Sequence, residues 1–471
     1  MTTQVSEALR PQGRLRDRAL QAGAWNMGAH AFETATRLIS NLIMTRLLFP
    51  EAFGGVGAAL AVITGLVLVS DFGVHVVIIQ SPRGDRDDFL RSAWIFQLWR
   101  GALLWIILCA FCAMLSIPWV HNLVPVSSVF ADSSFPLIAA VLGTSLVLAG
   151  ATSTTLWLNA RHLNFGPTVA IDICCRVLSM AVMFTWALLV PSVWALVAGA
   201  LVGNVLRLVL SHIIAPGPRM AFSWEKDHLQ EIIRFGKWIA VSTMGTFVSQ
   251  QSDLIILGIL LPGPIFGIYV IAKTLVDAVE GLLERLNSSL ALPILSEVAR
   301  NEPKRVRDRY YRFRLPIELA AASFGGVLFA SGEFVIHVLY DPRYAQAGLM
   351  IQLLAIGLTI YPFYLIRAAF TAMGDTHIVA GVSVLQAASM ILCLVGGFVI
   401  AGPFGAIGGL GVHRIVPSLT ILLLARRRNW IDPWRELRVV PVFIGGVVAG
   451  KLGVTMITAI GIADIAQLWG R

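Results

Sequence analysis

Long apolar segments separated by short polar loops recur along the whole chain. The apolar runs are continuous rather than alternating, as in Phe135 to Leu148, and about 20 such residues span a bilayer core as a helix. A membrane barrel would instead show segments of about 10 residues with alternating polarity. The pattern therefore predicts transmembrane helices. We expect twelve spans and a further apolar stretch, at residues 22–44, 53–79, 92–115, 135–158, 167–190, 192–213, 237–260, 264–292, 315–339, 346–370, 378–400, 404–425 and 439–462.

The composition agrees with this pattern. Of the 471 residues, 57% are hydrophobic and 13% are charged, and the mean hydropathy is +0.77. A soluble domain carries roughly 25% charged residues. So few charges cannot cover a globule with polar surface, so lipid must be the solvent for much of the chain.

Basic residues gather in alternate loops, on what we call the basic-loop side. The other side holds Arg46 and Arg343. Because basic loops stay in the cytoplasm, we expect a cytoplasmic N-terminus and a first helix that acts as a signal anchor. The net charge of +9 then reflects topology and attraction to anionic lipid headgroups rather than a nucleic-acid partner. The basic-loop side receives residues 10–18, 83–91, 161, 219–237, 300–314 and 426–438.

Two junctions between spans resemble each other and indicate an internal repeat. Residues 48–54 read Leu-Phe-Pro-Glu-Ala-Phe-Gly, and residues 261–267 read Leu-Pro-Gly-Pro-Ile-Phe-Gly. Proline ends one helix in each, and Phe-Gly opens the next. Six spans separate the junctions, so the halves have the same orientation, as in transporters that enclose a central cavity. We expect an all-α polytopic membrane protein with two parallel-related six-helix lobes. The predicted parts are a first lobe at 1–213, a cytoplasmic linker with an interfacial helix at 214–236, a second lobe at 237–425 and an extra apolar segment at 426–471.

Charged residues lie within the predicted spans, where a central Lys or Arg costs roughly 2.5–3.5 kcal/mol. One interpretation is that they form salt bridges within helices, because the spacing i,i+4 joins Glu33 to Arg37, Asp172 to Arg176, and Lys273 to Asp277. The other is that they line a water-filled cavity, whose basic excess would suit an anionic substrate. The candidate substrate-binding residues are Arg37, Arg100, Arg176, Lys273, Arg367 and Arg414.

Acidic residues are candidates for energy coupling. Asp253 and Asp277 stand at similar depth on consecutive predicted spans, so they could hold a sodium ion or share a proton; Glu33 and Asp71 are further candidates. The competing interpretation pairs Lys273 with Asp277 and leaves Asp253 lining the cavity. We find no nucleotide site, no metal-ligand spacing and no catalytic triad, and no cofactor is expected. The histidines that we considered are isolated along the chain, at His30, His75, His162 and His377.

Several short motifs, in order, resemble the Wzx-type oligosaccharide flippases, the polysaccharide-transporter branch of the MOP superfamily. The resemblance covers nearly the whole chain, although each piece is loose. The family more often has Leu at the position of Phe72. The motifs lie at residues 46–54, 70–74, 78–80, 161–165, 235–236, 267–269 and 293–296, with Asp172 and Asp253 between them.

The resemblance implies a transporter, not an enzyme, in the bacterial inner membrane. It would move an undecaprenyl-diphosphate-linked oligosaccharide from the cytoplasmic to the periplasmic leaflet. The partners that it implies are this substrate, membrane lipids and glycan polymerase machinery. Two alternatives stay open at this point. A MATE-like drug or cation exporter would favour an acidic cavity. A membrane glycan polymerase or ligase would carry a large outer loop, whereas the longest outer loop here, Ser116 to Ser134, has no basic residue.

Overall fold

The computed structural model describes residues 15–301 and 306–460, and within these ranges the chain is helical and has no strand. Arg10, Arg14, Lys304 and Arg305 of the basic-loop side lie outside the described residues. The chain divides into two compact units between Phe266 and Gly267. Each unit is described by itself. The predicted lobe boundaries differ from this division and stay a prediction, because they rest on the sequence repeat and not on contacts.

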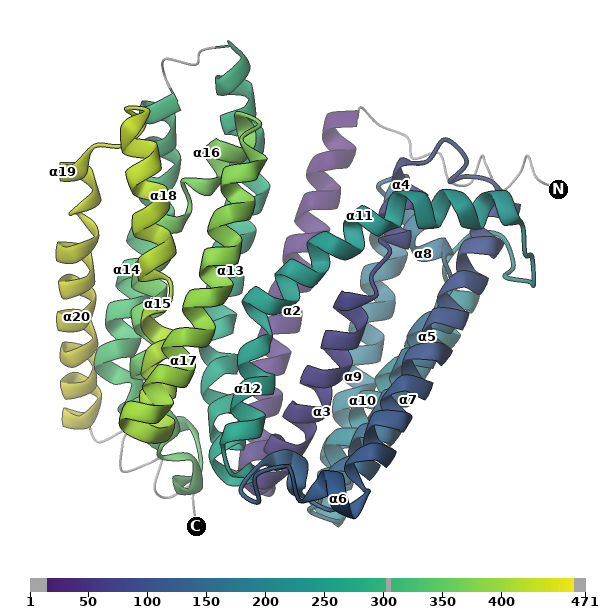
Figure 1. The fold of residues 1–471 in the computed structure, drawn as a ribbon, viewed down its shortest axis with the longest axis horizontal. Coiled ribbons are helices and arrows are strands. Elements are labelled where there is room, and N and C mark those ends of the chain that lie inside the picture. Colours follow the sequence, from purple (N-terminus) through teal and green to yellow (C-terminus); the bar gives the residue numbers. More distant parts are fainter. Residues whose placement is uncertain (1–14, 302–305, 461–471) are drawn as a thin grey trace. The chain divides into compact units, whose positions relative to one another are not determined.

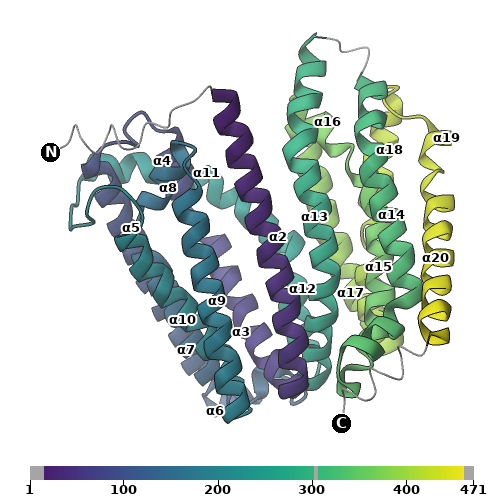
Figure 2. The ribbon, with the colours of Figure 1, turned by 180° about the vertical axis from the view of Figure 1, so that it is seen from behind.

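Unit 1 is a bundle of long helices joined by short ones (Figures 1 and 2). The helix α5 packs along α7, α9 packs along α10, and α2 packs along α9. Small residues allow these close approaches: a Cβ on Gly101 of α5 would lie 2.3 Å from the carbonyl oxygen of Leu146 in α7. The helices are α2 Leu15–Leu47, α3 Pro50–Val69, α4 Val74–Gln80, α5 Asp87–Leu115, α6 Pro118–His121, α7 Phe135–Ala151, α8 Thr155–Arg161, α9 Gly166–Leu189, α10 Val193–Ile213, α11 Lys226–Gln250, α12 Ser252–Leu260 and the 3-10 turn η1 Val129–Ala131.

The segment predicted as an interfacial helix is the first part of α11 rather than a separate element. Its first turns lie across the ends of α4 and α5 (Figure 1). Ile232 is fully buried there, in a cluster that includes Val74, Phe89 and Leu158. The apolar face of this segment therefore packs against unit 1.

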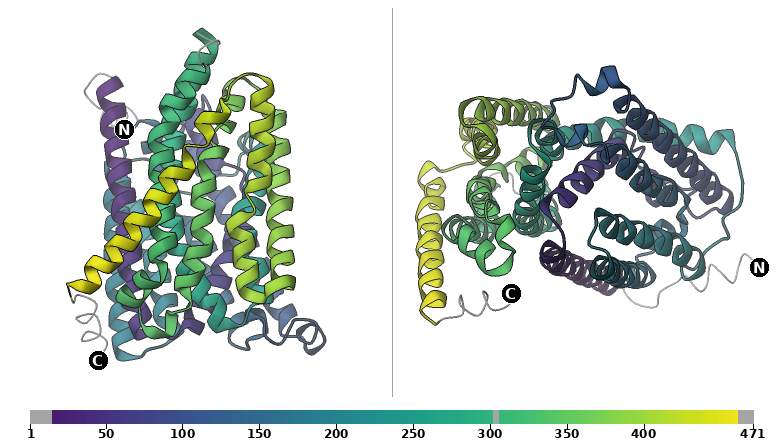
Figure 3. Two further views of the ribbon diagram at one scale, coloured as in Figure 1. Left: turned by 90° about the vertical axis from the view of Figure 1, so that its left-hand side faces the viewer. Right: turned by 90° about the horizontal axis from the view of Figure 1, so that it is seen from below.

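Unit 2 is built around α14, which packs against α15 on one side and α20 on another. Figure 3 shows α20 crossing α14 at an angle. A Cβ on Gly446 of α20 would lie 2.6 Å from the Ser323 carbonyl oxygen, so these two helices touch through backbone. The elements are α13 Gly263–Asn301, α14 Val306–Leu339, α15 Ala347–Tyr364, α16 Arg367–Ala372, α17 Thr376–Val412, α18 Ile415–Arg427, α19 Pro433–Glu436, α20 Val439–Ala459 and the 3-10 turn η3 Pro342–Tyr344.

The predicted all-α membrane architecture is confirmed. In the described ranges, eight helices are long and apolar enough to cross a membrane, or nine if the bent pair α7–α8 counts as one span. Several predicted spans are broken instead of straight. The span at 53–79 is interrupted between α3 and α4, and the span at 404–425 between α17 and α18. Within α17, Gly402 adopts φ +62° before Pro403, at the predicted boundary between the spans at 378–400 and 404–425. These breaks follow from residues that cannot continue a helix.

Candidate functional site

A cluster of charged and polar side chains lies between α2 and α9 in unit 1. It comprises Glu33, Thr36 and Arg37 of α2 and Arg176 of α9, and we call it the α2–α9 cluster. The Nε of Arg176 lies 3.4 Å from the Thr36 hydroxyl, and the charges of Glu33 and Arg37 both act on Arg176. Arg37 precedes the end of α2 at Leu47 by ten residues, about 15 Å along the helix.

Arg37 has a donor that the described residues do not satisfy. Its Nε is buried and has no hydrogen-bond partner in the described part of the chain. A buried donor without a partner carries a desolvation penalty of about 1–3 kcal/mol, more for a charged group. The predicted ion pair between Glu33 and Arg37 does not form among the described side chains. Glu33 is exposed and lies 3.9 Å from His30 Nδ1, so His30 is not isolated either.

The predicted pairing of Asp172 with Arg176 is wrong. Asp172 instead pairs with Arg207 of α10, Nη1 to Oδ1 at 2.9 Å. The helices α9 and α10 lie side by side, so a neighbouring helix supplies the partner that the helical spacing suggested within α9. With Asp172 paired elsewhere, Arg176 lies under the influence of two charges of α2, Glu33 and Arg37.

Arg100 and Asp71 meet at the break between α3 and α4. Arg100 donates through Nη2 to the Val67 carbonyl oxygen at 2.8 Å and through Nε to the Ser70 hydroxyl at 3.1 Å. Asp71 accepts a hydrogen bond from the Gly73 amide at 2.8 Å, and its carboxylate lies 4.0 Å from Arg100. Arg100 therefore caps the C-terminal end of α3, where carbonyl groups lack helical partners.

The same broken helix is capped at its other end by a residue from the resemblance motifs. Arg161 of α8 donates through Nη1 to the carbonyl oxygens of Ile78, Ile79 and Ser81 at 2.7–2.8 Å. Sequence reasoning missed this role. The signal available to it was the position of Arg161 in a loop motif, which does not reveal the carbonyl groups that it meets.

In unit 2, charged side chains along α13 contact partners. Lys273 and Asp277 form the predicted pair, with Nζ 3.5 Å from Oδ1. Arg414 binds Glu280 at 2.5 Å. Further along α13, Glu284 accepts a hydrogen bond from the Tyr361 hydroxyl at 2.5 Å. Opposite charges thus meet in pairs.

The remaining predicted residues lie elsewhere. Arg367 begins α16, where it donates to the Tyr364 hydroxyl at 3.0 Å and lies 4.7 Å from the centre of that ring. Asp253 is buried, with 4% of its surface exposed, in the first turn of α12 in unit 1. Asp277 belongs to unit 2, so the predicted pairing of Asp253 with Asp277 as a coupling site stays a prediction.

A fully buried charge network at the start of α14 was missed. Arg314 was predicted as the last basic residue of a loop, but it lies inside α14 with none of its side chain exposed. It contacts Glu318 at 3.0 Å and Glu436 of α19 at 2.5 Å. Its spacing of four from Glu318 was the available signal, but the third partner is remote in sequence.

These placements sort the candidate cations by what they contact. Arg100 caps backbone carbonyls, and Lys273 and Arg414 face carboxylates. Arg37 and Arg176, in contrast, are two guanidinium groups whose charges act on each other. Guanidinium groups bind phosphate oxygens through paired N–H donors. The α2–α9 cluster can therefore receive an anion such as a phosphate or diphosphate.

Comparison with known proteins adds a family. The sequence profile of the family described as "Polysaccharide biosynthesis protein" matches residues 43–348. A curated relative is the succinoglycan biosynthesis transport protein ExoT of Rhizobium meliloti (strain 1021), 20% identical over 336 residues. The match covers 70% of this chain and 64% of that relative, so it spans less than two thirds of the relative's length.

Solved structures share the fold. The lipid II flippase MurJ in an inward closed conformation matches with a TM-score of 0.70 at 13% identity, covering 95% of this chain and 97% of that one. An inward-facing MATE family transporter of the MOP superfamily matches with a TM-score of 0.59 at 14% identity, covering 86% and 95%. At these identities the likeness concerns the fold alone.

Proposed function

This chain belongs to the family of polysaccharide biosynthesis proteins, and from that premise we propose that it is a lipid-linked oligosaccharide flippase. It carries an undecaprenyl-diphosphate-linked oligosaccharide across a bacterial inner membrane, from the cytoplasmic to the periplasmic leaflet. The product then serves synthesis of an exopolysaccharide, a capsule or an O-antigen. The N-terminus faces the cytoplasm, because the basic-loop side holds most of the charges that determine orientation; cysteine labelling from either side of the membrane checks this.

The observation that carries the proposal is the buried Nε of Arg37, which has no hydrogen-bond partner in the described part of the chain and belongs to a charge that acts on Arg176. A diphosphate offers oxygens that accept from both guanidinium groups. A cationic drug would be repelled by the same pair, which argues against the exporter alternative. The cluster also holds Glu33, whose side chain is exposed, so it contains one carboxylate for two arginines.

The experiment replaces Arg37 and follows export of the glycan in cells. Arg37→Ala abolishes export while the protein still accumulates in the membrane, because the diphosphate loses its donor. Arg37→Lys keeps partial export, since Lys supplies charge without the bidentate fork. The matched control is Arg207→Gln, a nearby arginine whose charge already meets Asp172; it keeps most of the export.

Purified protein in vesicles gives the direct measurement. Wild type moves a fluorescent lipid-linked oligosaccharide between leaflets, and Arg37→Ala does not. The proposal fails if the vesicles transport a cationic drug and not the glycan lipid. The assignment of Arg37 fails if Arg37→Ala reduces only the amount of protein in the membrane, which would make the residue structural.

A further inference from the structure

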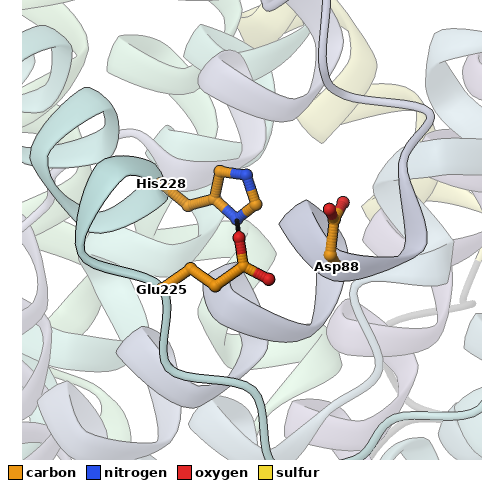
Figure 4. Close-up of side chains that lie close together, drawn as sticks. All are labelled: Asp88, Glu225 and His228. Atoms are coloured by element: carbon orange, nitrogen blue, oxygen red, sulfur yellow. Dashed lines mark ion pairs between the residues drawn. The ribbon is translucent and has the colours of Figure 1, made fainter.

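Three side chains that commonly bind metals meet where α5 and α11 begin. Asp88 lies in the first turn of α5, Glu225 precedes α11 as its N-cap, and His228 lies in the first turn of α11. Each offers one ligand atom, and these atoms all lie within 4.8 Å of one another. Figure 4 shows the imidazole and the two carboxylates converging from the two helices. Glu225 and His228 are three residues apart, but Asp88 is remote in sequence, so spacing alone does not reveal the group of three.

The distance between two of these atoms suits a tetrahedral metal ion. His228 Nδ1 lies 3.4 Å from Glu225 Oε2. Two ligands at about 2.0–2.1 Å from a tetrahedral zinc ion are roughly 3.4 Å apart. An ion can therefore sit between these two atoms without moving either helix. The third ligand atom, from Asp88, lies within 4.8 Å of both.

The ordinary roles of these residues explain only part of the arrangement. Carboxylates at helix N-termini are stabilised by the helix dipole, which accounts for Asp88 and Glu225. Asp88 also accepts two hydrogen bonds from Arg86, at 3.1 and 2.5 Å, and one from the Phe89 amide at 2.8 Å. A carboxylate has about four lone-pair sites, so one stays available. His228 and Glu225 form an ion pair between residues three apart, and Asp88 brings a second carboxylate close to this pair from another helix.

His228 is held in place rather than free to turn toward solvent. Only 3% of its side chain is exposed. Its ring meets Phe89 edge to face with the centroids 5.3 Å apart, and Nδ1 lies 3.4 Å from the Ser92 hydroxyl. Packing therefore orients Nδ1 toward the same point as the carboxylates. A preoriented imidazole lowers the entropic cost of binding a metal ion.

We propose that Asp88, Glu225 and His228 bind a divalent transition-metal ion, with Zn²⁺ as the best match. One imidazole and two carboxylates leave the fourth tetrahedral position for water. Magnesium and calcium prefer sites made wholly of oxygen ligands, so the histidine argues against them. The bound ion joins the start of α11 to the start of α5. It thereby fixes the end of the segment that joins α10 to α11 against the start of α5.

The experiment measures zinc on the purified full-length protein in detergent. The protein is stripped with a chelator, supplied with Zn²⁺ and freed of excess ion, and the retained zinc is counted by mass spectrometry. Wild type retains one zinc ion per chain more than Glu225→Gln or Asp88→Asn. The loss of a ligand lowers zinc affinity by at least about 10-fold, the low end of the effect of removing an outer-shell partner.

The control is a second histidine–carboxylate pair of the same unit. His162 Nε2 lies 2.9 Å from Asp85 Oδ1, and His162→Gln retains as much zinc as wild type. Equal retention by wild type, Glu225→Gln and Asp88→Asn overturns the proposal, as does an equal loss in His162→Gln. Glu225 is half exposed, so its variant is expected to fold. None of these residues belongs to the α2–α9 cluster, so the result does not depend on the flippase proposal.

Discussion

The buried network around Arg314 makes a prediction about stability that can be worked out from its contacts. Arg314 meets Glu318 and Glu436, and both Arg314 and Glu318 have fully buried side chains. The Tyr311 hydroxyl donates to Glu436 at 2.6 Å. The nearest other cation to Glu318 is Arg438, at 3.9 Å. Arg314→Met would thus leave two carboxylates in a dry site with one distant cation.

The expected cost is that of breaking a buried ion pair, about 3–5 kcal/mol. For a domain of 150–250 residues, 1 kcal/mol shifts the melting temperature by about 2–4 °C, so Arg314→Met should lower it by about 6–20 °C. Unit 2, Gly267–Arg471, is in this size range. The double variant Arg314→Met/Glu318→Met should recover part of the loss, because an apolar pair replaces Arg314 and Glu318 while Glu436 keeps only the hydrogen bond from the Tyr311 hydroxyl.

The assay is thermal unfolding of the purified protein in detergent at one fixed heating rate, since unfolding of such proteins is often irreversible. The control is Arg435→Gln. Arg435 is partly exposed, and its carboxylate contacts are long, at 3.7 and 3.9 Å, so its removal should cost no more than about 1 kcal/mol. If Arg314→Met and Arg435→Gln have the same melting temperature, close to that of wild type, then water reaches the network and the reasoning is refuted.

Two further predictions concern the break in α3–α4 and energy coupling. Gly236→Ala should destabilise the protein by about 1–3 kcal/mol through overpacking, because its Cβ would lie 2.3 Å from the Phe72 carbonyl oxygen. The control is Gly245→Ala on the same helix, which has open space around its Cβ and should be neutral or slightly stabilising. Equal melting temperatures of the two variants would contradict this. We also expect transport by Asp253→Asn in vesicles to lose sensitivity to the proton or sodium gradient, because Asp253 is the more deeply buried carboxylate of the two candidates. Asp277 is already ion-paired with Lys273, so Asp277→Asn should keep this sensitivity. Unchanged sensitivity in both variants would exclude both residues as the coupling site.

The sequence predicted the helices well because apolar run length is a local property. It predicted their breaks less well. The run at 53–79 is apolar across Asp71, Phe72 and Gly73, yet the Asp71 side chain binds the Gly73 amide and Gly73 adopts φ +57°. These residues favour a turn, but the turn is stabilised by Arg100 from another helix. A single helix cannot reveal that partner.

Charge pairs show the same limit. The spacing i,i+4 correctly joined Lys273 to Asp277. The same rule failed for Asp172, because Arg207 of the adjacent helix approaches to 2.9 Å. Spacing along one helix states which residues share a face, but not which helix lies against that face. The group of Asp88, Glu225 and His228 could not be predicted from spacing either, because Asp88 lies on another helix than the one that Glu225 and His228 begin.

The structure narrows the argument from charge to function. From the sequence, every basic residue within a span counts equally toward an anionic substrate. Their contacts separate them: Arg100 satisfies helix-end carbonyls, Arg207 and Arg414 satisfy carboxylates, and removing any of these three would expose a partner of opposite polarity. Arg37 differs, because its buried Nε has no partner among the described residues. A charged residue in lipid is costly, and the Nε of Arg37 stabilises no described partner. A bound ligand best explains why Arg37 is there. The case for a diphosphate therefore depends on Arg37, and the total of basic residues adds little to it.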